Sequence, residues 1–182
     1  MKKIETKVDG AYRLQPKVFG DQRGFFLESW NRQTFASIGV DVEFVQDNHS
    51  RSGKNVLRGL HYQVERPQGK LVWVTQGAVF DAFVDLRRGS PTFGIWDGHI
   101  LSEENKERLW IPPGCAHGFL VLSATTDFQY KCTEYYAPAL ERTLRWDDPE
   151  IKIDWPIAAG EHPILSSKDS EGMYFQEAEK FQ

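Results

Sequence analysis

Residues 70–86 read KLVWVTQGAVFDAFVDL. Valine, leucine and aromatic residues fill both halves of this stretch, which is typical of strands. Gln76-Gly77 divides the halves, and glycine accepts the positive φ angle that a tight turn requires. The stretch therefore predicts two strands, Lys70–Thr75 and Ala78–Leu86, joined as a hairpin.

Similar short segments with period-two patterning, bounded by turn residues, recur along most of the chain. They predict further strands at Gly24–Trp30, Glu43–Asn48, Val56–Gln63, Phe93–Ser102, Glu107–Ile111, His117–Leu122 and Thr126–Tyr136. Helical patterns are confined to Asn31–Ile38, which Gly39 would end, and to Glu171–Phe181. So many short strands in one chain predict an all-β fold, a jelly-roll sandwich or barrel with short helices at its periphery.

The composition limits the class of protein. The 182 residues fit a single domain over 1–182. With 40% hydrophobic and 26% charged residues the chain is not disordered, and 13% aromatic residues favour sheets and flat-ligand pockets. The net charge of −4 and the lack of Lys/Arg blocks argue against nucleic-acid binding. No apolar run is long enough to suggest a membrane span.

Cysteine usage and the start of the chain predict a cytoplasmic location. Two cysteines, Cys115 and Cys132, are too few for a disulfide framework and suit a reducing compartment. Residues 1–7, MKKIETK, lack the apolar region of a signal peptide. We assign neither cysteine a functional role.

The open end of a jelly roll is a natural pocket. On the predicted strand Thr126–Tyr136 one face carries Phe128, Tyr130, Cys132, Glu134 and Tyr136. On an unbroken strand Tyr130 and Tyr136 would be about 20 Å apart. On the predicted strand His117–Leu122 one face carries His117, Phe119 and Val121. These groups either line a pocket or, taken singly, cap an ordinary core.

His61 lies in Arg58-Gly59-Leu60-His61-Tyr62-Gln63 and is a candidate general base, because imidazole accepts protons near neutral pH. Strict alternation places Arg58 and His61 on opposite faces. Both can reach one ligand only if the strand bends, and Gly59 is the expected position of a bulge. The alternative is a histidine that simply belongs to the core.

The pattern Pro112-x-Gly114-x-x-His117 resembles the second motif of cupin jelly rolls, in which this histidine binds a metal. Cupin metal sites draw further ligands from an earlier His-x-His and a downstream Glu. Here His61-Tyr62-Gln63 has an amide at the second position, which leaves a divalent cation short of ligands. We therefore expect no metal.

Two further features stay open at this level. Lys70 opens a strand; if it points inward, its ammonium could stabilise an oxyanion, and otherwise it is merely solvated. Arg23 and Glu28 could form an exposed ion pair, which contributes little to stability.

Ten segments together resemble the dTDP-4-dehydrorhamnose 3,5-epimerase family, metal-free cupins of deoxysugar biosynthesis. They are 21–28 (DQRGFFLE), 46–50 (QDNHS), 57–63 (LRGLHYQ), 68–72 (QGKLV), 90–94 (SPTFG), 110–112 (WIP), 116–119 (AHGF), 130–131 (YK), 135–136 (YY) and 167–169 (SKD). They follow the family's order along almost the whole chain.

The resemblance implies conversion of dTDP-4-dehydro-6-deoxy-D-glucose to dTDP-4-dehydro-L-rhamnose, in dTDP-L-rhamnose biosynthesis. The 4-ketone acidifies the hydrogens at C3 and C5, and inversion needs a base on one face and an acid on the other. By resemblance His61 is the base, Asp169 orients it, Tyr130 is the acid and Lys70 steadies the enolate oxygen.

The family resemblance also implies a substrate-binding set, a homodimer and no cofactor. The set comprises Arg23, Phe26, Glu28, Gln46, Asp47, Asn48, Arg58, His117, Phe119, Tyr136, Glu141 and Lys168. Tyr136 would stack on thymine, and the segment Arg23–Glu28 would reach the pocket of the neighbouring subunit.

Three other functions compete with this one. A 3-only or 5-only epimerase on a related nucleotide sugar would share most of these residues. A metal-dependent cupin oxygenase would need the missing ligands. A non-catalytic sugar-binding jelly roll would not need His61, Lys70, Tyr130 and Asp169 together.

Overall fold

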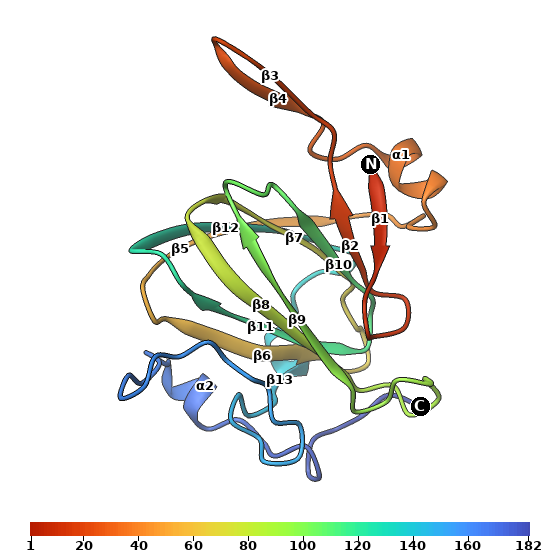
Figure 1. The fold of residues 1–182 in the computed structure, drawn as a ribbon. Helices are drawn as coiled ribbons and strands as arrows, with labels where there is room; N and C mark the ends of the chain where they lie inside the picture. The colour runs from red at the N-terminus through yellow and green to blue at the C-terminus, as the bar shows by residue number, and fades with distance from the viewer.

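The computed structural model describes all 182 residues. Most of the strands belong to two antiparallel sheets that face each other (Figure 1). The six-stranded sheet has the order β1 (Lys2–Glu5), β2 (Tyr12–Gln15), β10 (Arg108–Ile111), β7 (Lys70–Gln76), β12 (Thr125–Cys132) and β5 (Gln46–Gly53). The five-stranded sheet has the order β13 (Glu141–Thr143), β6 (Leu57–Gln63), β11 (Cys115–Val121), β8 (Ala78–Asp85) and β9 (Trp96–Ser102). This architecture confirms the predicted all-β sandwich.

Smaller elements lie outside the two sheets. A hairpin of β3 (Val18–Asp21) and β4 (Gly24–Leu27) projects away from the body of the molecule (Figure 1). The remaining elements are α1 (Arg32–Ser37), the 3-10 helix η1 (Pro138–Leu140) and α2 (Ser167–Ser170). None of the helices is long and apolar enough to cross a membrane.

Helix α1 confirms the prediction at Asn31–Ile38. The Asn31 side chain accepts hydrogen bonds from the backbone N–H groups of Gln33 and Thr34. This satisfies donors that the first helical turn leaves free. Gly39 follows the helix with φ +90°, as expected of a glycine that ends a helix.

The predicted hairpin at Gln76-Gly77 is wrong. β7 pairs with β10 and β12, whereas β8 pairs with β11 and β9, so the short connection passes from one sheet to the other. Gly77 has φ +77° as predicted, and a Cβ there would lie 2.2 Å from the Thr125 carbonyl oxygen. The glycine is therefore needed for a corner between sheets, which local patterning does not distinguish from a hairpin turn.

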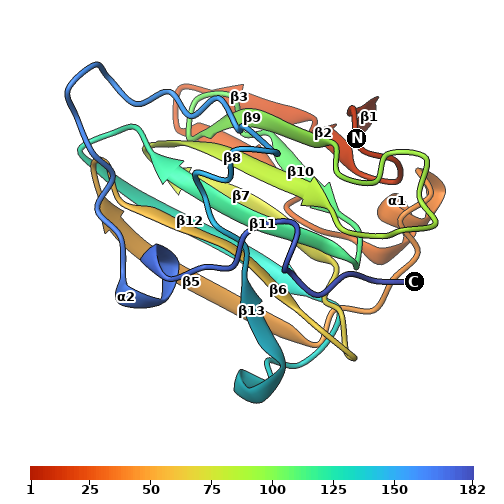
Figure 2. The same cartoon turned by 90° about the horizontal axis from the view of Figure 1, so that it is seen from below.

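The predicted C-terminal helix at Glu171–Phe181 is also wrong. The segment runs in an irregular path across the outer face of the five-stranded sheet (Figure 2). The backbone N–H of Phe181 donates to the Leu86 carbonyl oxygen, and that of Phe175 donates to the Asp148 carboxylate. Both aromatic rings pack against the core on this face. These tertiary contacts replace the helical hydrogen bonds.

The space between the sheets is apolar at one end and open at the other. The main core cluster includes Val72 and Val74 of β7, Phe83 of β8, and Val121 of β11. Because side chains alternate along each strand, the same inward faces continue into a cavity where the apolar residues give way to polar ones. This cavity is the candidate site.

Candidate active site

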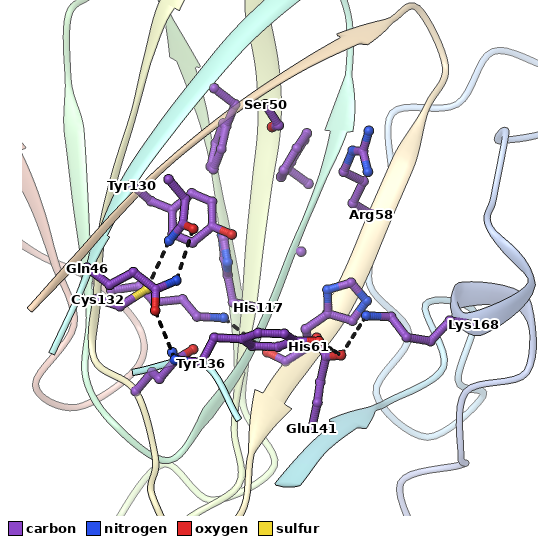
Figure 3. Close-up of a pocket in the computed structure, with 16 residues that line it drawn as sticks. Gln46, Ser50, Arg58, His61, His117, Tyr130, Cys132, Tyr136, Glu141 and Lys168 are labelled. Atoms are coloured by element: carbon purple, nitrogen blue, oxygen red, sulfur yellow. Dashed lines mark hydrogen bonds and ion pairs between the residues drawn. The ribbon is translucent and has the colours of Figure 1, made fainter. Parts of the chain in front are cut away.

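The cavity between the sheets has a volume of about 340 Å³ and receives side chains from both of them (Figure 3). Eleven of the sequence-predicted residues line it: Gln46, Asn48, Arg58, His61, Lys70, His117, Phe119, Tyr130, Tyr136, Glu141 and Lys168. Within β5, Gln46 and Asn48 have the same parity, and β12 places Tyr130 opposite Asn48. Alternation along the strands thus carries chemically different side chains to one space.

The bulge predicted at Gly59 is confirmed. Between β6 and β11, His61 pairs with His117 and Arg58 pairs with Phe119, so three steps on one strand oppose two on the other. The extra residue in β6 reverses which side chains of this strand point toward the cavity on either side of the bulge. Arg58 and His61 therefore both reach the cavity, as the bent-strand interpretation required.

His61 and Asp169 form a hydrogen-bonded pair at the edge of the cavity. His61 Nε2 lies 2.6 Å from Asp169 Oδ1, and the Ser166 hydroxyl donates to Oδ2 at 2.6 Å. Burial alone would raise the pKa of Asp169, but the hydrogen bonds from His61 and Ser166 lower it to about 2. The carboxylate stays ionised and holds a proton on Nε2, which leaves Nδ1 of the neutral ring as an acceptor.

Burial lowers the pKa of His61 below 6.5, and the nearby Lys168 and Lys70 act in the same direction. The hydrogen bond and negative charge of Asp169 oppose this shift. The imidazole is therefore kept neutral near pH 7 with a carboxylate ready to stabilise its protonated form. A histidine in this state is suited to remove a proton from a substrate.

Lys70 is buried at the start of β7, with its ammonium close to the strand that carries His61. Its Nζ donates a long hydrogen bond of 3.5 Å to the His61 carbonyl oxygen and forms no ion pair. Burial lowers its pKa below 10.5. Most of its donor capacity is thus free for a ligand.

Aromatic side chains form one wall of the cavity. The rings of Phe119 and Phe128 stack with centroids 4.1 Å apart, and Tyr130 lies beside Phe128 at 6.1 Å. Burial raises the pKa of Tyr130 to about 12, so its hydroxyl keeps its proton over the physiological range. Tyr130 can donate a proton from a rigid apolar wall.

His117 is held from behind by a residue that the sequence did not single out. Its Nε2 lies 2.9 Å from Oδ2 and 3.1 Å from Oδ1 of Asp81, which is fully buried in β8. The pair fixes the orientation of the imidazole in the cavity wall. Asp81 was missed because it lies on the predicted strand Ala78–Leu86 without any motif around it.

Glu141 joins the outer part of the cavity into one network. Its Oε2 accepts hydrogen bonds from the Tyr136 hydroxyl at 2.9 Å and from Lys168 Nζ at 2.8 Å (Figure 3). Burial would raise the pKa of Glu141, but these two donors lower it. An aromatic ring and an ammonium are thereby held together at the mouth of the cavity.

The histidine and amide positions of the cupin-like motifs do not assemble a metal centre. No group of three or more His, Cys, Asp or Glu side chains is arranged to hold an ion. His117 Nε2 faces Asp81, and the Gln63 side-chain oxygen accepts a hydrogen bond from the Ala137 N–H at 2.8 Å. The side chains of His117 and Gln63 are thus already used in hydrogen bonds within the protein.

Four residues of the predicted binding set lie outside the cavity. Arg23, Phe26 and Glu28 are in or next to the projecting β3–β4 hairpin, and Phe26 is 69% exposed. Asp47 has the opposite parity to Gln46 and pairs with Lys131 at 2.8 Å. Their roles in binding stay predictions.

Arg23 and Glu28 do not form the ion pair that the sequence left open as an alternative. Arg23 pairs with Asp21 at 2.5 Å, whereas the Glu28 carboxylate accepts hydrogen bonds from Asn31 and Thr34. Arg23 lies in the tight turn of the hairpin, two residues after Asp21, and Glu28 lies beside the start of α1. Local geometry therefore gives each side chain a nearer partner.

The cavity also contains residues that the sequence interpretation did not assign. They are Ser50, Gln68, Gly118, Phe128 and Cys132. Phe128 and Cys132 share the parity of Tyr130, so the pattern already contained the signal for them. For Gln68 and Gly118 the sequence offers no comparable signal.

The chain is similar to known proteins over its whole length. The family model described as dTDP-4-dehydrorhamnose 3,5-epimerase matches residues 5–177. The dTDP-4-dehydrorhamnose 3,5-epimerase of Pseudomonas aeruginosa is 54% identical over 100% of this chain and 99% of its own length.

Solved structures agree with the sequence match. The Legionella pneumophila dTDP-6-deoxy-D-glucose-3,5-epimerase, in complex with dTDP-4-keto-L-rhamnose, has a TM-score of 0.94 and 51% identity, covering 98% of this chain and 94% of that one. The 3′-monoepimerase ChmJ of Streptomyces bikiniensis is more distant, with a TM-score of 0.85 and 32% identity over 92% of this chain and 84% of that one. The chain belongs to the dTDP-4-dehydrorhamnose 3,5-epimerase family.

Proposed function

We propose that His61 and Tyr130 carry out the 3,5-epimerase reaction of this protein, which converts dTDP-4-dehydro-6-deoxy-D-glucose to dTDP-4-dehydro-L-rhamnose in dTDP-L-rhamnose biosynthesis. The observation that carries the proposal is the 2.6 Å contact between His61 and Asp169, beside a cavity that Tyr130 also lines. An oriented base, His61, and a protonated acid, Tyr130, thus line the same cavity.

Each inversion consists of two proton transfers. His61 Nδ1 takes the proton from C3 or C5, and the electron pair of the broken C–H bond moves into an enolate with its charge on the C4 oxygen. Tyr130 then gives a proton to the same carbon from the opposite face, and the ketone forms again. Solvent finally restores the proton of Tyr130 and removes the one on His61.

The ammonium of Lys70 is the proposed partner of the enolate oxygen. It is buried, weakly bonded and therefore free to meet a charge that develops during the reaction. A donor placed in advance at such an oxygen is worth about 3–4 kcal/mol of transition-state stabilisation.

The nucleotide is proposed to occupy the outer part of the cavity. Arg58 and Lys168 are cations suited to a diphosphate, and Tyr136, which is 50% exposed, offers a ring for thymine. The dTDP-sugar in the Legionella relative supports a ligand of this kind. Gln46, Asn48, His117, Phe119 and Glu141 complete the proposed lining.

Proton exchange in D₂O tests the assignment of the base. We expect the parent enzyme to introduce deuterium at C3 and C5 of the substrate, as followed by NMR, and His61→Asn to remain folded but introduce none. The exposed His162 gives a matched control, because His162→Asn changes the same side chain outside the cavity. Near-normal exchange in His61→Asn would exclude His61 as the base.

The same spectra decide between double and single epimerisation. Both carbons flank the ketone, so a 3,5-epimerase exchanges and inverts both. A spectrum with exchange and inversion at one carbon only would support the monoepimerase alternative.

We further propose that the protein is a homodimer. The projecting hairpin exposes Phe19, Phe25 and Phe26 to solvent, which is costly for a single subunit. A second subunit packed against the hairpin would cover these aromatic residues.

Light scattering at micromolar concentration tests the dimer and should give about twice 21.0 kDa. Phe26→Ser should weaken the dimer and nucleotide binding together if the hairpin reaches the neighbouring pocket. A fully active monomer would refute the proposal.

We also propose a cytoplasmic location, since both cysteines are buried free thiols, as suits a reducing compartment. Cell fractionation that recovers the protein outside the cytoplasm would contradict it.

A further inference from the structure

Gln63 is a buried amide at the end of β6, only 3% exposed. Its Nε2 donates to the Arg66 carbonyl oxygen at 2.7 Å and to the Tyr135 carbonyl oxygen at 3.2 Å. Its Oε1 accepts from the Ala137 N–H at 2.8 Å. Both N–H groups and the oxygen of the side chain are therefore bonded to backbone atoms.

Two of these hydrogen bonds hold the backbone immediately before and immediately after Tyr136. The Tyr135 carbonyl precedes this residue and the Ala137 N–H follows it. A second amide, Gln46, accepts the Tyr136 N–H through its Oε1 at 2.9 Å. The ring itself is 50% exposed and is bonded only through its hydroxyl to Glu141.

The backbone here needs such support because β12 ends at Cys132. Beyond that point no neighbouring strand supplies regular hydrogen bonds, and side chains take over this role. Gln68 Nε2, for example, donates to the Glu134 carbonyl oxygen at 2.9 Å. The predicted strand Thr126–Tyr136 is therefore wrong at its C-terminal end, and Tyr136 lies beyond the strand.

We propose that Gln63 is a positioning residue for nucleotide binding: it holds the backbone on both sides of Tyr136 so that the ring is fixed before thymine arrives. A ring that is fixed in advance loses less conformational freedom on binding. This inference rests on the proposed role of Tyr136 in stacking on the base. It also assigns a role to the Gln63 amide, which occupies the position of the second histidine in metal-binding cupins.

Two substitutions of Gln63 remove the support in different ways. Gln63→Met keeps the length of the side chain and loses all three hydrogen bonds. Gln63→Glu keeps the acceptor for the Ala137 N–H but places an anion against two carbonyl oxygens. We expect either variant to weaken dTDP binding by roughly tenfold, measured by calorimetry, which is the order of a few lost hydrogen bonds.

The effect should fall on KM and on the dissociation constant of dTDP, while kcat at saturating substrate stays within about twofold. Tyr62→Phe is the matched control, because Tyr62 is the neighbouring residue of β6 and packs in the core on the other face. Its dTDP affinity should equal that of the parent.

A double-mutant cycle separates positioning from general support of the fold. In a Tyr136→Ala background, Gln63→Met should change dTDP affinity by less than about twofold, because the ring that it positions is gone. Equal weakening in both backgrounds would overturn the inference, as would an unchanged affinity in both single variants at Gln63. If Tyr136→Ala alone binds dTDP like the parent, the proposed role of Tyr136 fails, and the inference fails with it.

Discussion

His61 and Asp169 are 108 positions apart in the chain, yet His61 Nε2 lies 2.6 Å from Asp169 Oδ1. Asp169 is brought there by the short helix α2, whose N-cap Ser166 accepts from the Asp169 N–H and donates to its carboxylate. The Gly59 N–H adds a third donor at 3.2 Å. The carboxylate is thus fixed by its own helix and by the bulge of the strand that carries the base.

Removing the charge of Asp169 should change the pH dependence as well as the rate. Asp169 raises the pKa of His61 against the effect of burial, so Asp169→Asn should lower that pKa further. We expect the acid limb of kcat/KM, where activity is lost as His61 becomes protonated, to move to lower pH. At the same time kcat should fall by roughly 10²- to 10⁴-fold.

The control is Asp147→Asn, which removes a carboxylate paired with Arg145 on the surface. This variant should leave both the acid limb of kcat/KM and the value of kcat unchanged. An acid limb that stays in place in Asp169→Asn would show that another group titrates there.

Tyr130→Phe should separate proton removal from inversion. The substitution removes the proposed acid and no bulk, while His61 can still remove a proton and return it on its own face. We expect deuterium exchange to persist and inversion to fall at one or both carbons, as measured by NMR in D₂O. Tyr174→Phe, at an exposed ring, is the control. Inversion of both centres at the parent rate would exclude Tyr130 as the acid.

Activity should survive prolonged treatment with EDTA. His61, Gln63 and His117 occupy positions that a cupin metal would use, and they already bond to Asp169, to backbone atoms and to Asp81, respectively. Elemental analysis should find no stoichiometric ion. Loss of activity that Fe²⁺, Mn²⁺ or Zn²⁺ restores would contradict this and favour the oxygenase class.

Local patterning predicted the parts of the site that lie on single strands. Tyr130 and Cys132 share a face because strand side chains alternate, and the bulge at Gly59 followed from the need to bring Arg58 and His61 together. Such features depend on a few neighbouring residues, which a sequence displays directly.

Features that depend on distant contacts could not be predicted in this way. Nothing near Asp81 indicates that His117 will face it, and the pairing of His61 with Asp169 came from family resemblance alone. The turn at Gly77 looks the same in sequence whether its strands pair or separate. The path of the segment around Phe175 is set by the sheet on which it packs.

The corner at Gly77 should be intolerant of a side chain. A Cβ at this position would lie 2.2 Å from the Thr125 carbonyl oxygen, and φ is +77°. We expect Gly77→Ala to reduce the free energy of unfolding by about 1–3 kcal/mol or more, measured by denaturant titration. Gly89→Ala, at an exposed turn with open space around it, should change it by less than about 0.5 kcal/mol. Equal stability of the two variants would refute the structural role of Gly77.

Lys70→Met should separate catalysis from stability. Lys70 is buried without an ion pair, and burying an ammonium in this way costs free energy that an apolar side chain of similar length does not. We therefore expect Tm to stay the same or rise, while kcat falls by roughly 10²- to 10³-fold because the enolate oxygen loses its charged donor. The affinity for dTDP should change little, since Lys70 is assigned to the sugar. Lys54→Met removes an exposed ammonium and should alter neither quantity. If Tm and kcat of Lys70→Met fall together, Lys70 serves the packing of the sheet and another group must stabilise the enolate.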